Sequence, residues 1–411
     1  MFFQRMTNLA MRGATLVSKL LLTLFLAKFF SLSDLGSYGL ILVTVAYCNE
    51  IVGGQFYSYT TRLLVKTEEG HSWIIQQQLI FHLLMYLLLI PVASYLIFSE
   101  IIPFELFVLI FPIMLAEHIS QEQQRWLIAL SKPLQATLLL FLRSGIWPIV
   151  LIILCLIVPE FRTLKVLFCT WLAGSATSCF LGVLFIQRDI EIKRIKTVDF
   201  QWIKKGVLSS LPFLYSTLIA QGVYTIDRYL VDRIGGAEIL GVYTLFFSVV
   251  SALVPFADAC IFHFNYPQQI KNWQEKKYTA FFGLAQKMYL HIFLLVLVFI
   301  PVCYLFIYGY VTWLKKDIFL ENMYLLPTLL AAVSLQVFGL VSHYQLYSVG
   351  ADRSIIINQS IGALVFVGTV FTLSGLLKVQ AIPLGMVFMN LTVLFLNRSS
   401  VKHGVTSLVP A

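Results

Sequence analysis

The chain has 411 residues, of which 59% are hydrophobic and 12% charged, and its formal net charge is +9. Soluble domains carry about a quarter charged residues, so this composition excludes a soluble globular protein and predicts an integral membrane protein. The basic residues lie in short segments between apolar runs, where they orient membrane proteins, so we do not interpret the positive charge as a sign of nucleic-acid binding.

Twelve apolar runs are close to or above the length of about 20 residues that a transmembrane helix needs. We therefore predict an all-α protein with about twelve transmembrane helices. The expected spans are 14–30, 38–58, 76–98, 104–130, 134–158, 164–186, 207–232, 239–262, 280–308, 322–348, 355–376 and 378–397.

A short motif occurs twice, 205 residues apart. Leu35–Leu40 reads LGSYGL and Leu240–Leu245 reads LGVYTL, each after an apolar run that ends in a basic residue, Lys28 or Arg233, and a short polar turn. An offset of half the chain indicates an internal duplication. Six spans per copy predict parallel repeats.

The resulting division has three parts. Residues 1–186 would form an N-terminal six-helix bundle, residues 187–206 a basic cytoplasmic linker helix, and residues 207–411 a C-terminal six-helix bundle, with a central cavity between the bundles. With the N-terminus inside, the predicted cytoplasmic segments hold three times as many Lys and Arg residues as the opposite side. Since cytoplasmic loops are enriched in these residues, both termini are predicted to be cytoplasmic.

The fourth span is the most polar. Glu117, Gln121 and Gln124 recur at helical spacing, and His118, Glu122 and Arg125 form a neighbouring row. Such a stripe can hold helices together by hydrogen bonds. For Glu117 and His118, near the middle of the span, we favour a functional role, because an acid beside a histidine can carry a proton.

Other ionisable residues also lie within spans, where each is costly and usually faces a bundle interior or a wet cavity. Arg228 either binds substrate or pairs with Asp227 or Asp232, and Gln221 lies on the same face. Two rows of basic residues facing a central cavity would suit an anionic substrate, although Lys28 and Arg233 lie near span ends and could reach the headgroups instead. The remaining candidates are the cations Lys19, Lys28, Arg143 and Lys287 and the acids Glu50 and Asp258.

Enzyme signatures are absent from the sequence. It contains no GxxxxGK[ST], HExxH or GxSxG motif, and its six cysteines show no metal-binding spacing. We therefore predict a protein that is not an enzyme, with no metal site and no cofactor.

Three segments carry a resemblance to a known family: RGATLVSKLLLTLFLAKFFSLSDLGSYGL at 12–40, AEHISQEQQRWLIALSKP at 116–133, and the DRY…LGVYTL stretch at 227–245. With them, nearly the whole chain resembles the Wzx-type O-antigen flippases, in the polysaccharide-exporter branch of the multidrug/oligosaccharidyl-lipid/polysaccharide (MOP) superfamily. The resemblance implies a protein of the bacterial inner membrane that moves undecaprenyl-diphosphate-linked oligosaccharide units to the outer leaflet.

The resemblance also implies site roles and partners. The cavity candidates for diphosphate and sugar are Lys19, Lys28, Arg143, Arg228, Lys287, Gln121 and Gln221. The candidates for proton or sodium coupling are Glu50, Glu117, His118, Glu122 and Asp258. Membrane lipid, a polysaccharide polymerase and a chain-length regulator are the expected partners, in O-antigen and lipopolysaccharide biosynthesis.

Two other functions stay open. An O-antigen polymerase or ligase is also a many-helix membrane protein, but such enzymes carry a large external loop, and the longest external segments here are short. A multidrug or small-solute antiporter of the same superfamily would share the fold, but its cavity should favour acids over bases.

Overall fold

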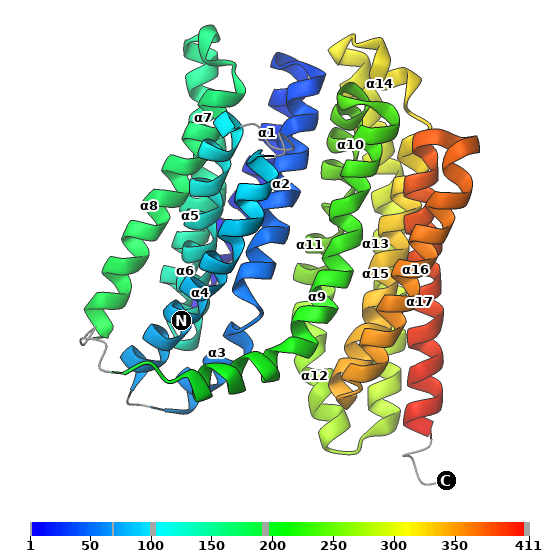
Figure 1. Ribbon diagram of the computed structural model, residues 1–411. Helices are drawn as coiled ribbons and strands as arrows, with labels where there is room; N and C mark the ends of the chain where they lie inside the picture. Colours follow the sequence, from blue (N-terminus) through cyan, green and yellow to red (C-terminus); the bar gives the residue numbers. More distant parts are fainter. Residues whose placement is uncertain (1, 68–69, 99–103, 191–196, 407–411) are drawn as a thin grey trace. The chain divides into compact units, whose positions relative to one another are not determined.

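The computed structural model describes residues 2–67, 70–98, 104–190 and 197–406, and in these ranges the chain forms helices and no strand (Figure 1). This confirms the all-α prediction. Ten stretches of the described chain are long and apolar enough to cross a membrane, so the protein is a multi-pass membrane protein.

The ten stretches are related simply to the twelve predicted spans. Helix α5 (Phe104–Ala129), which carries Glu117, Glu122 and Arg125, is not among them, and α16 (Asp352–Leu377) and α17 (Ala381–Thr406) together make a single stretch. Each predicted span falls on a helix or on consecutive helices of the structure.

The helices pack into two compact units. Unit 1 comprises residues 1–30 and 41–218, and unit 2 comprises residues 31–40 and 219–411. Helices α2 (Leu32–Gly53) and α9 (Phe200–Gly235) each contribute to both units, since a helix packs against whichever neighbours cover its apolar surface. The division into bundles at 1–186 and 207–411 stays a prediction. Part of the predicted linker, 191–196, lies outside the described residues.

Unit 1 has α5 at its centre, where it packs against α8, α6 and α3. Besides parts of α2 and α9, the unit contains α1 (Phe2–Phe29), α3 (Tyr57–Lys66), α4 (His71–Phe98), α5, α6 (Pro133–Phe141), the π-helical turn η1 (Leu142–Ile146), α7 (Trp147–Ile157), the 3₁₀ turn η2 (Pro159–Phe161) and α8 (Leu164–Asp189).

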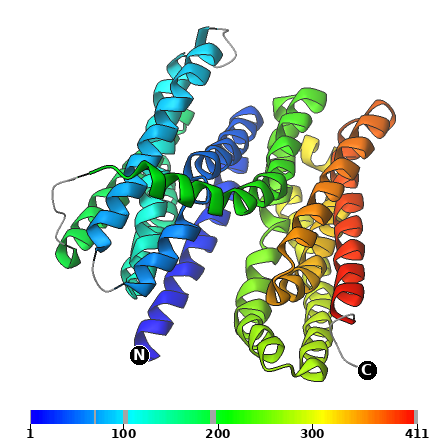
Figure 2. The same cartoon turned by 60° about the horizontal axis from the view of Figure 1, so that its bottom comes forward.

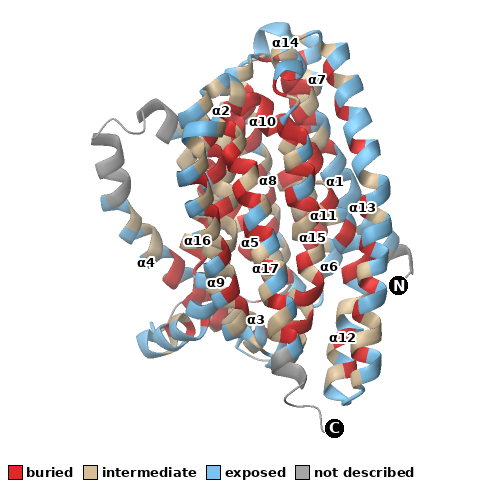
Figure 3. Ribbon diagram, turned by 90° about the vertical axis from the view of Figure 1, so that its right-hand side faces the viewer, coloured by how far each residue is buried: buried red, intermediate tan, exposed pale blue. Residues whose placement is uncertain are grey.

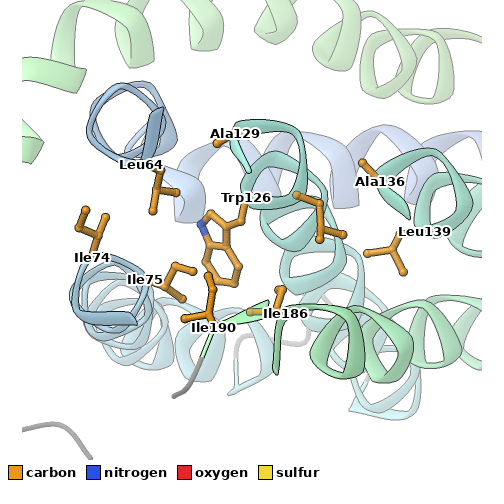
Figure 4. Packing of buried hydrophobic residues seen from close by; sticks show 10 residues of the cluster. Leu64, Ile74, Ile75, Trp126, Ala129, Ala136, Leu139, Ile186 and Ile190 are labelled. Carbon is orange, nitrogen blue, oxygen red and sulfur yellow. The ribbon is translucent and has the colours of Figure 1, made fainter. Parts of the chain in front are cut away.

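A tryptophan anchors one end of unit 1. Trp126 of α5 lies among Leu64 of α3, Ile75 of α4 and Ile186 of α8 (Figure 4), and each of these side chains is no more than 5% exposed. Close packing of this kind supplies the van der Waals contacts that hold membrane helices together. The core therefore fixes α4, α5 and α8 beside one another.

Helix α2 is shorter at its C-terminus than the sequence predicts. The expected span 38–58 continues through Ser58, whereas α2 ends at Gly53. Gly54 and Gln55 have positive φ angles of 57° and 52°, a conformation outside the right-handed helix, and α3 begins at Tyr57. The turn brings the backbone of Gly53 to the interior of unit 1.

Unit 2 is built around α15 and α17. Helix α17 packs against both α15 and α16, and Figure 2 shows α16 and α17 side by side. The unit contains α10 (Ala237–Val250), α11 (Leu253–Ala257), the π-helical turn η3 (Asp258–Phe262), α12 (His263–Gln274), α13 (Tyr278–Leu314), α14 (Asp317–Glu321), α15 (Leu325–Val349), α16, the 3₁₀ turn η4 (Lys378–Gln380) and α17.

Burial separates the helices of unit 2 into two kinds. Helices α10 and α15 carry buried residues on most of their turns, whereas α13 is largely exposed (Figure 3). Most of the exposed positions of α13 are apolar, among them Leu290, Phe293 and Leu297, and Lys287 is an exception. An apolar surface of this kind is suited to lipid, which fits a membrane span.

The two copies of the repeated motif meet within unit 2. A Cβ on Gly36 would collide with the backbone oxygen of Ala237, and a Cβ on Gly241 would collide with the backbone oxygen of Leu32. Each glycine thus faces the carbonyl of the residue four positions before the other glycine. The contact has local two-fold symmetry, as expected where equivalent residues of two repeats pack together.

Candidate functional site

The interior of unit 1 is polar along α5. Glu117, His118 and Glu122 are 9%, 1% and 1% exposed, so both rows of the predicted stripe turn into the bundle. A buried charge inside a membrane protein must be paired or hydrogen-bonded, or it faces a wet cavity. Two groups of side chains on neighbouring helices provide those partners.

The first group surrounds Glu117. Arg143 Nη1 donates to Glu117 Oε2 at 2.9 Å, while Trp171 Nε1 and Ser175 Oγ of α8 donate to Oε1 at 2.8 and 2.9 Å. Arg143 lies in the π-helical turn η1, and such turns often occur at functional sites. Lys19 of α1 is exposed, and it interacts electrostatically with Glu117 and Arg143.

The second group surrounds Glu122, one helical turn further along α5. Arg125 forms an ion pair with Glu122 and lies 3.9 Å from a carboxylate oxygen of Glu50. Gln78 of α4 donates to Glu122 Oε2 at 2.6 Å. The guanidinium of Arg125 also stacks over the ring of Tyr57, 3.7 Å from the ring centre.

Glu50 has further polar partners. Gln55 Nε2 donates to its carboxylate at 2.5 Å, and Gln121 forms a side-chain hydrogen bond to it. Gln121, predicted to bind substrate, therefore lies in this network of unit 1. Glu50 and Glu122, which are 72 positions apart in the chain, share Arg125.

Unit 2 holds a third buried pair. Arg228 Nη1 donates to Asp227 Oδ1 at 2.8 Å and to the backbone oxygen of Tyr224 at 2.6 Å. Tyr243 donates to Asp227 Oδ2 at 2.7 Å, and Arg228 stacks over Phe247, 4.3 Å from the ring centre. Of the two acids that the sequence left open, Asp227 is the one that binds Arg228.

The other predicted site residues named below do not form a cluster with one another. Lys28, Lys287 and Asp258 are exposed, and Gln221 is half-buried. Lys28 lies over the ring of Phe29, with its ammonium 5.2 Å from the ring centre. Asp258 begins the π-helical turn η3 of unit 2.

Sequence reasoning missed the contribution of α4. Gln78, His82 and Tyr86 follow one another at intervals of four residues in α4, and all three reach the interior beside α5. Tyr86 Oη lies 2.9 Å from His118 Nδ1, and the rings of His82 and His118 are 4.6 Å apart. The spacing is a helical signal that identifies the face, although not its partners.

The arrangement can hold charged side chains inside the membrane without the free-energy cost of burying an unpaired ion. The acids Glu50, Glu117, Glu122 and Asp227 each contact an arginine and at least one neutral donor. The exposed Lys19 and Lys287 lie on helices that cross the membrane. An anion can approach such lysines, and an ion or proton can interact with the acid networks.

Neither family sequence models nor curated protein sequences match this chain. Solved structures do match it. An inward-facing structure of a multidrug resistance MATE family transporter of the MOP superfamily has a TM-score of 0.77 at 16% identity, over 98% of each chain.

Two further structures are similar over most of their length. An outward-facing structure of a multidrug resistance MATE family transporter of the MOP superfamily has a TM-score of 0.65 at 15% identity, over 99% of this chain and 94% of that one. A MOP superfamily transporter from Pyrococcus furiosus Vc1, with a binding pocket of reverse polarity that suggests a different function, has a TM-score of 0.62 at 14% identity, over 100% of this chain and 95% of that one. The chain therefore has the fold of the MATE transporters of the MOP superfamily.

Proposed function

We propose that this protein is a flippase for lipid-linked oligosaccharides. Its substrate would be an oligosaccharide repeat unit on undecaprenyl diphosphate, moved from the cytoplasmic to the periplasmic leaflet of the inner membrane. The transporter fold supports the class of activity. The resemblance of three segments to the polysaccharide exporters supports the substrate.

One observation carries the choice of an anionic substrate. The embedded acids Glu50, Glu117, Glu122 and Asp227 are half-buried or buried and contact arginines, whereas Lys19 and Lys287 are exposed. An acid that already contacts an arginine attracts a cationic drug weakly. An exposed ammonium group within a span binds a diphosphate oxygen as a point charge.

The proposed mechanism is alternating access. Lysine and arginine side chains would hold the diphosphate, polar and aromatic side chains would hold the sugars, and the lipid tail would stay in the bilayer. The Glu50, Glu117 and Glu122 networks, with His118, and the exposed Asp258 are the groups for coupling to protons or sodium. A coupled transporter should lose its dependence on the ion gradient when these acids are neutralised.

A multidrug antiporter is the second candidate. The similar structures named above include multidrug resistance transporters, and Asp258 of unit 2 is an exposed acid that a cationic drug could reach. The polymerase or ligase alternative has no comparable support, because the similar structures are transporters.

Reconstitution separates the two candidates. The purified protein is placed in liposomes with a fluorescent undecaprenyl-diphosphate oligosaccharide, and the fraction protected from an external quencher is followed over time. We expect flipping in these liposomes and little uptake of a cationic dye. Lys19→Ala and Lys287→Ala should each slow flipping about tenfold, the equivalent of one lost charge-assisted contact of about 1.4 kcal/mol.

The matched control is Lys205→Ala, which removes an exposed lysine near the start of α9. It should leave the rate unchanged. Dye transport that requires Asp258, with no movement of the lipid-linked sugar, would replace the flippase proposal with the multidrug antiporter.

A further inference from the structure

We propose that His82, His118 and Glu122 form a binding site for a divalent transition-metal ion of the zinc type. One ligand atom from each side chain lies within 4.8 Å of the other two. The three residues are 5%, 1% and 1% exposed and come from α4 and α5. This site lies inside unit 1 and does not depend on which substrate the protein transports.

The histidine nitrogens provide the first argument. Within the described part of the chain, His82 Nε2 and His118 Nε2 are buried and have no hydrogen-bond partner. A buried polar atom left without a partner is costly, and a bound ion is one established explanation for such an atom. Two such atoms, on neighbouring rings whose centres are 4.6 Å apart, indicate a shared ligand.

The rest of each ring is already held. Tyr86 Oη lies 2.9 Å from His118 Nδ1, and His82 has a hydrogen bond to the backbone of Gly53. Metal-bound histidines commonly use the second ring nitrogen in this way, which fixes the orientation of the first. On Glu122, Gln78 holds Oε2 at 2.6 Å, and Trp126 in turn donates to Gln78 at 2.8 Å.

Gly53 leaves space beside these groups. A Cβ at this position would lie 3.4 Å from His118 Nε2, 3.8 Å from Glu122 Oε1 and 3.9 Å from Arg125. Any residue with a side chain would therefore occupy the volume next to both ligand atoms. Glycine keeps that volume available for an ion and a coordinating water.

The distance between the ligand atoms and the types of ligand atom indicate which metal ion the site would bind. His118 Nε2 and Glu122 Oε1 are 3.9 Å apart, whereas ligands of tetrahedral zinc, with bonds of about 2.0–2.1 Å, are about 3.4 Å apart. Small side-chain rotations can close this difference. Imidazole nitrogens favour zinc and its neighbours over sodium, magnesium and calcium, and three protein ligands leave a fourth position for water.

Arg125 competes with the metal for the same carboxylate oxygen. A bound ion would take Glu122 Oε1 from Arg125, whose other acidic neighbour, Glu50, lies 3.9 Å away. Metal binding should therefore transfer the pairing of Arg125 from Glu122 to Glu50, at the end of α2.

The test uses the full-length protein in detergent, with any affinity tag removed and after treatment with a chelator. Cobalt is titrated first because its visible absorption reports tetrahedral coordination, and zinc is then added to displace it. We expect one cobalt per chain and its displacement by zinc. His82→Ala, His118→Ala and Glu122→Gln should each weaken binding at least about tenfold.

Gly53→Ala is the sharper variant, since it keeps all three ligands and fills the space beside them. Its backbone is not left-handed, so alanine is tolerated. It should weaken cobalt binding, while Gly283→Ala, where a Cβ meets nothing within 4 Å, should not. His343→Ala controls for a half-buried histidine elsewhere.

Monodisperse elution and an unchanged helical circular dichroism spectrum establish that each variant is folded. The proposal is overturned if the folded wild-type protein gives no tetrahedral cobalt spectrum, or if the spectrum persists unchanged in the folded His118→Ala and Gly53→Ala variants. Neither result bears on flipping, which is measured separately.

Discussion

At the scale of single residues, the described interior stabilises charge by pairing it across helices. Glu117 of α5 accepts hydrogen bonds from Arg143 of η1 and from Trp171 and Ser175 of α8. Removing the acid from such a pair strongly destabilises the fold. The arginine charge then stays buried, with neither a counter-charge nor water around it.

The Glu117–Arg143 pair can be tested by a double-mutant cycle. Glu117→Gln and Arg143→Gln should each lower the unfolding free energy by about 3–5 kcal/mol, because each leaves an uncompensated charge. The double variant should lose less unfolding free energy than the two single variants lose together. Thermal unfolding in detergent measures all three, and strictly additive effects would show that the two side chains do not interact.

The Asp227 pair gives a second residue-scale prediction. Tyr243→Phe removes the hydroxyl that donates to Asp227 at 2.7 Å and should cost about 1.5–3 kcal/mol, as expected for a hydrogen bond to a charged group. Tyr224→Phe is the matched control, because its hydroxyl makes a longer bond of 3.4 Å to Asn390. Equal losses of stability in the two variants would contradict the role of Tyr243.

At the scale of elements, the repeated LGxYxL motif is a packing device. Gly36 and Gly241 let the start of α2 approach α10 until backbone meets backbone. Small residues at such crossings are typical of membrane helices, where close approach takes the place of the hydrophobic effect. The tyrosine of the second copy reaches Asp227, so this motif also positions the buried pair.

Substitution of either glycine should force the two helices apart. Gly36→Ala and Gly241→Ala each place a Cβ against a backbone carbonyl that has no room to move, and we expect a loss of about 1–3 kcal/mol or more. Gly309→Ala on α13 meets nothing within 4 Å and should be neutral or stabilising. Thermal unfolding of the three variants is the measurement, and wild-type stability in both motif variants would contradict the close approach.

At the scale of the whole molecule, the side of the membrane that each turn faces sets the direction of transport. The end of α12 and the turn after it form one of the predicted cytoplasmic segments, which carries Lys271, Lys276 and Lys277. A hydrogen bond from Lys277, 2.6 Å from Glu275, lowers the pKa of that exposed carboxyl. The lowered pKa keeps the Glu275 carboxyl ionised at neutral pH, so this turn belongs in water.

Reporter fusions test the predicted orientation. Green fluorescent protein fused after Ala411 or inserted at Lys276 should fluoresce, because both sites are predicted to be cytoplasmic. Alkaline phosphatase inserted at Lys315, on the predicted outer side, should be active. The reverse pattern at these sites would invert the topology and, with it, the direction of the proposed transport.

Local features of the sequence determined the all-α class and most of the spans, because the length of an apolar run and the spacing of 3.6 residues depend only on near neighbours. They also placed Glu117, His118 and Glu122 on the inner side of α5. Even the pair Asp227–Arg228 was among the expected alternatives, since its members are adjacent in the chain.

Only the tertiary structure decided the partners. Glu117 meets Arg143 across 26 positions and Ser175 across 58, and the polar face of α4 meets α5 across about 40. The break at Gly54 likewise depends on backbone angles that the apolar run 38–58 did not reveal. Periodicity specifies which side of a helix is polar, but the neighbour it faces is set by how all the helices bury their surfaces together, and that packing is a property of the folded chain.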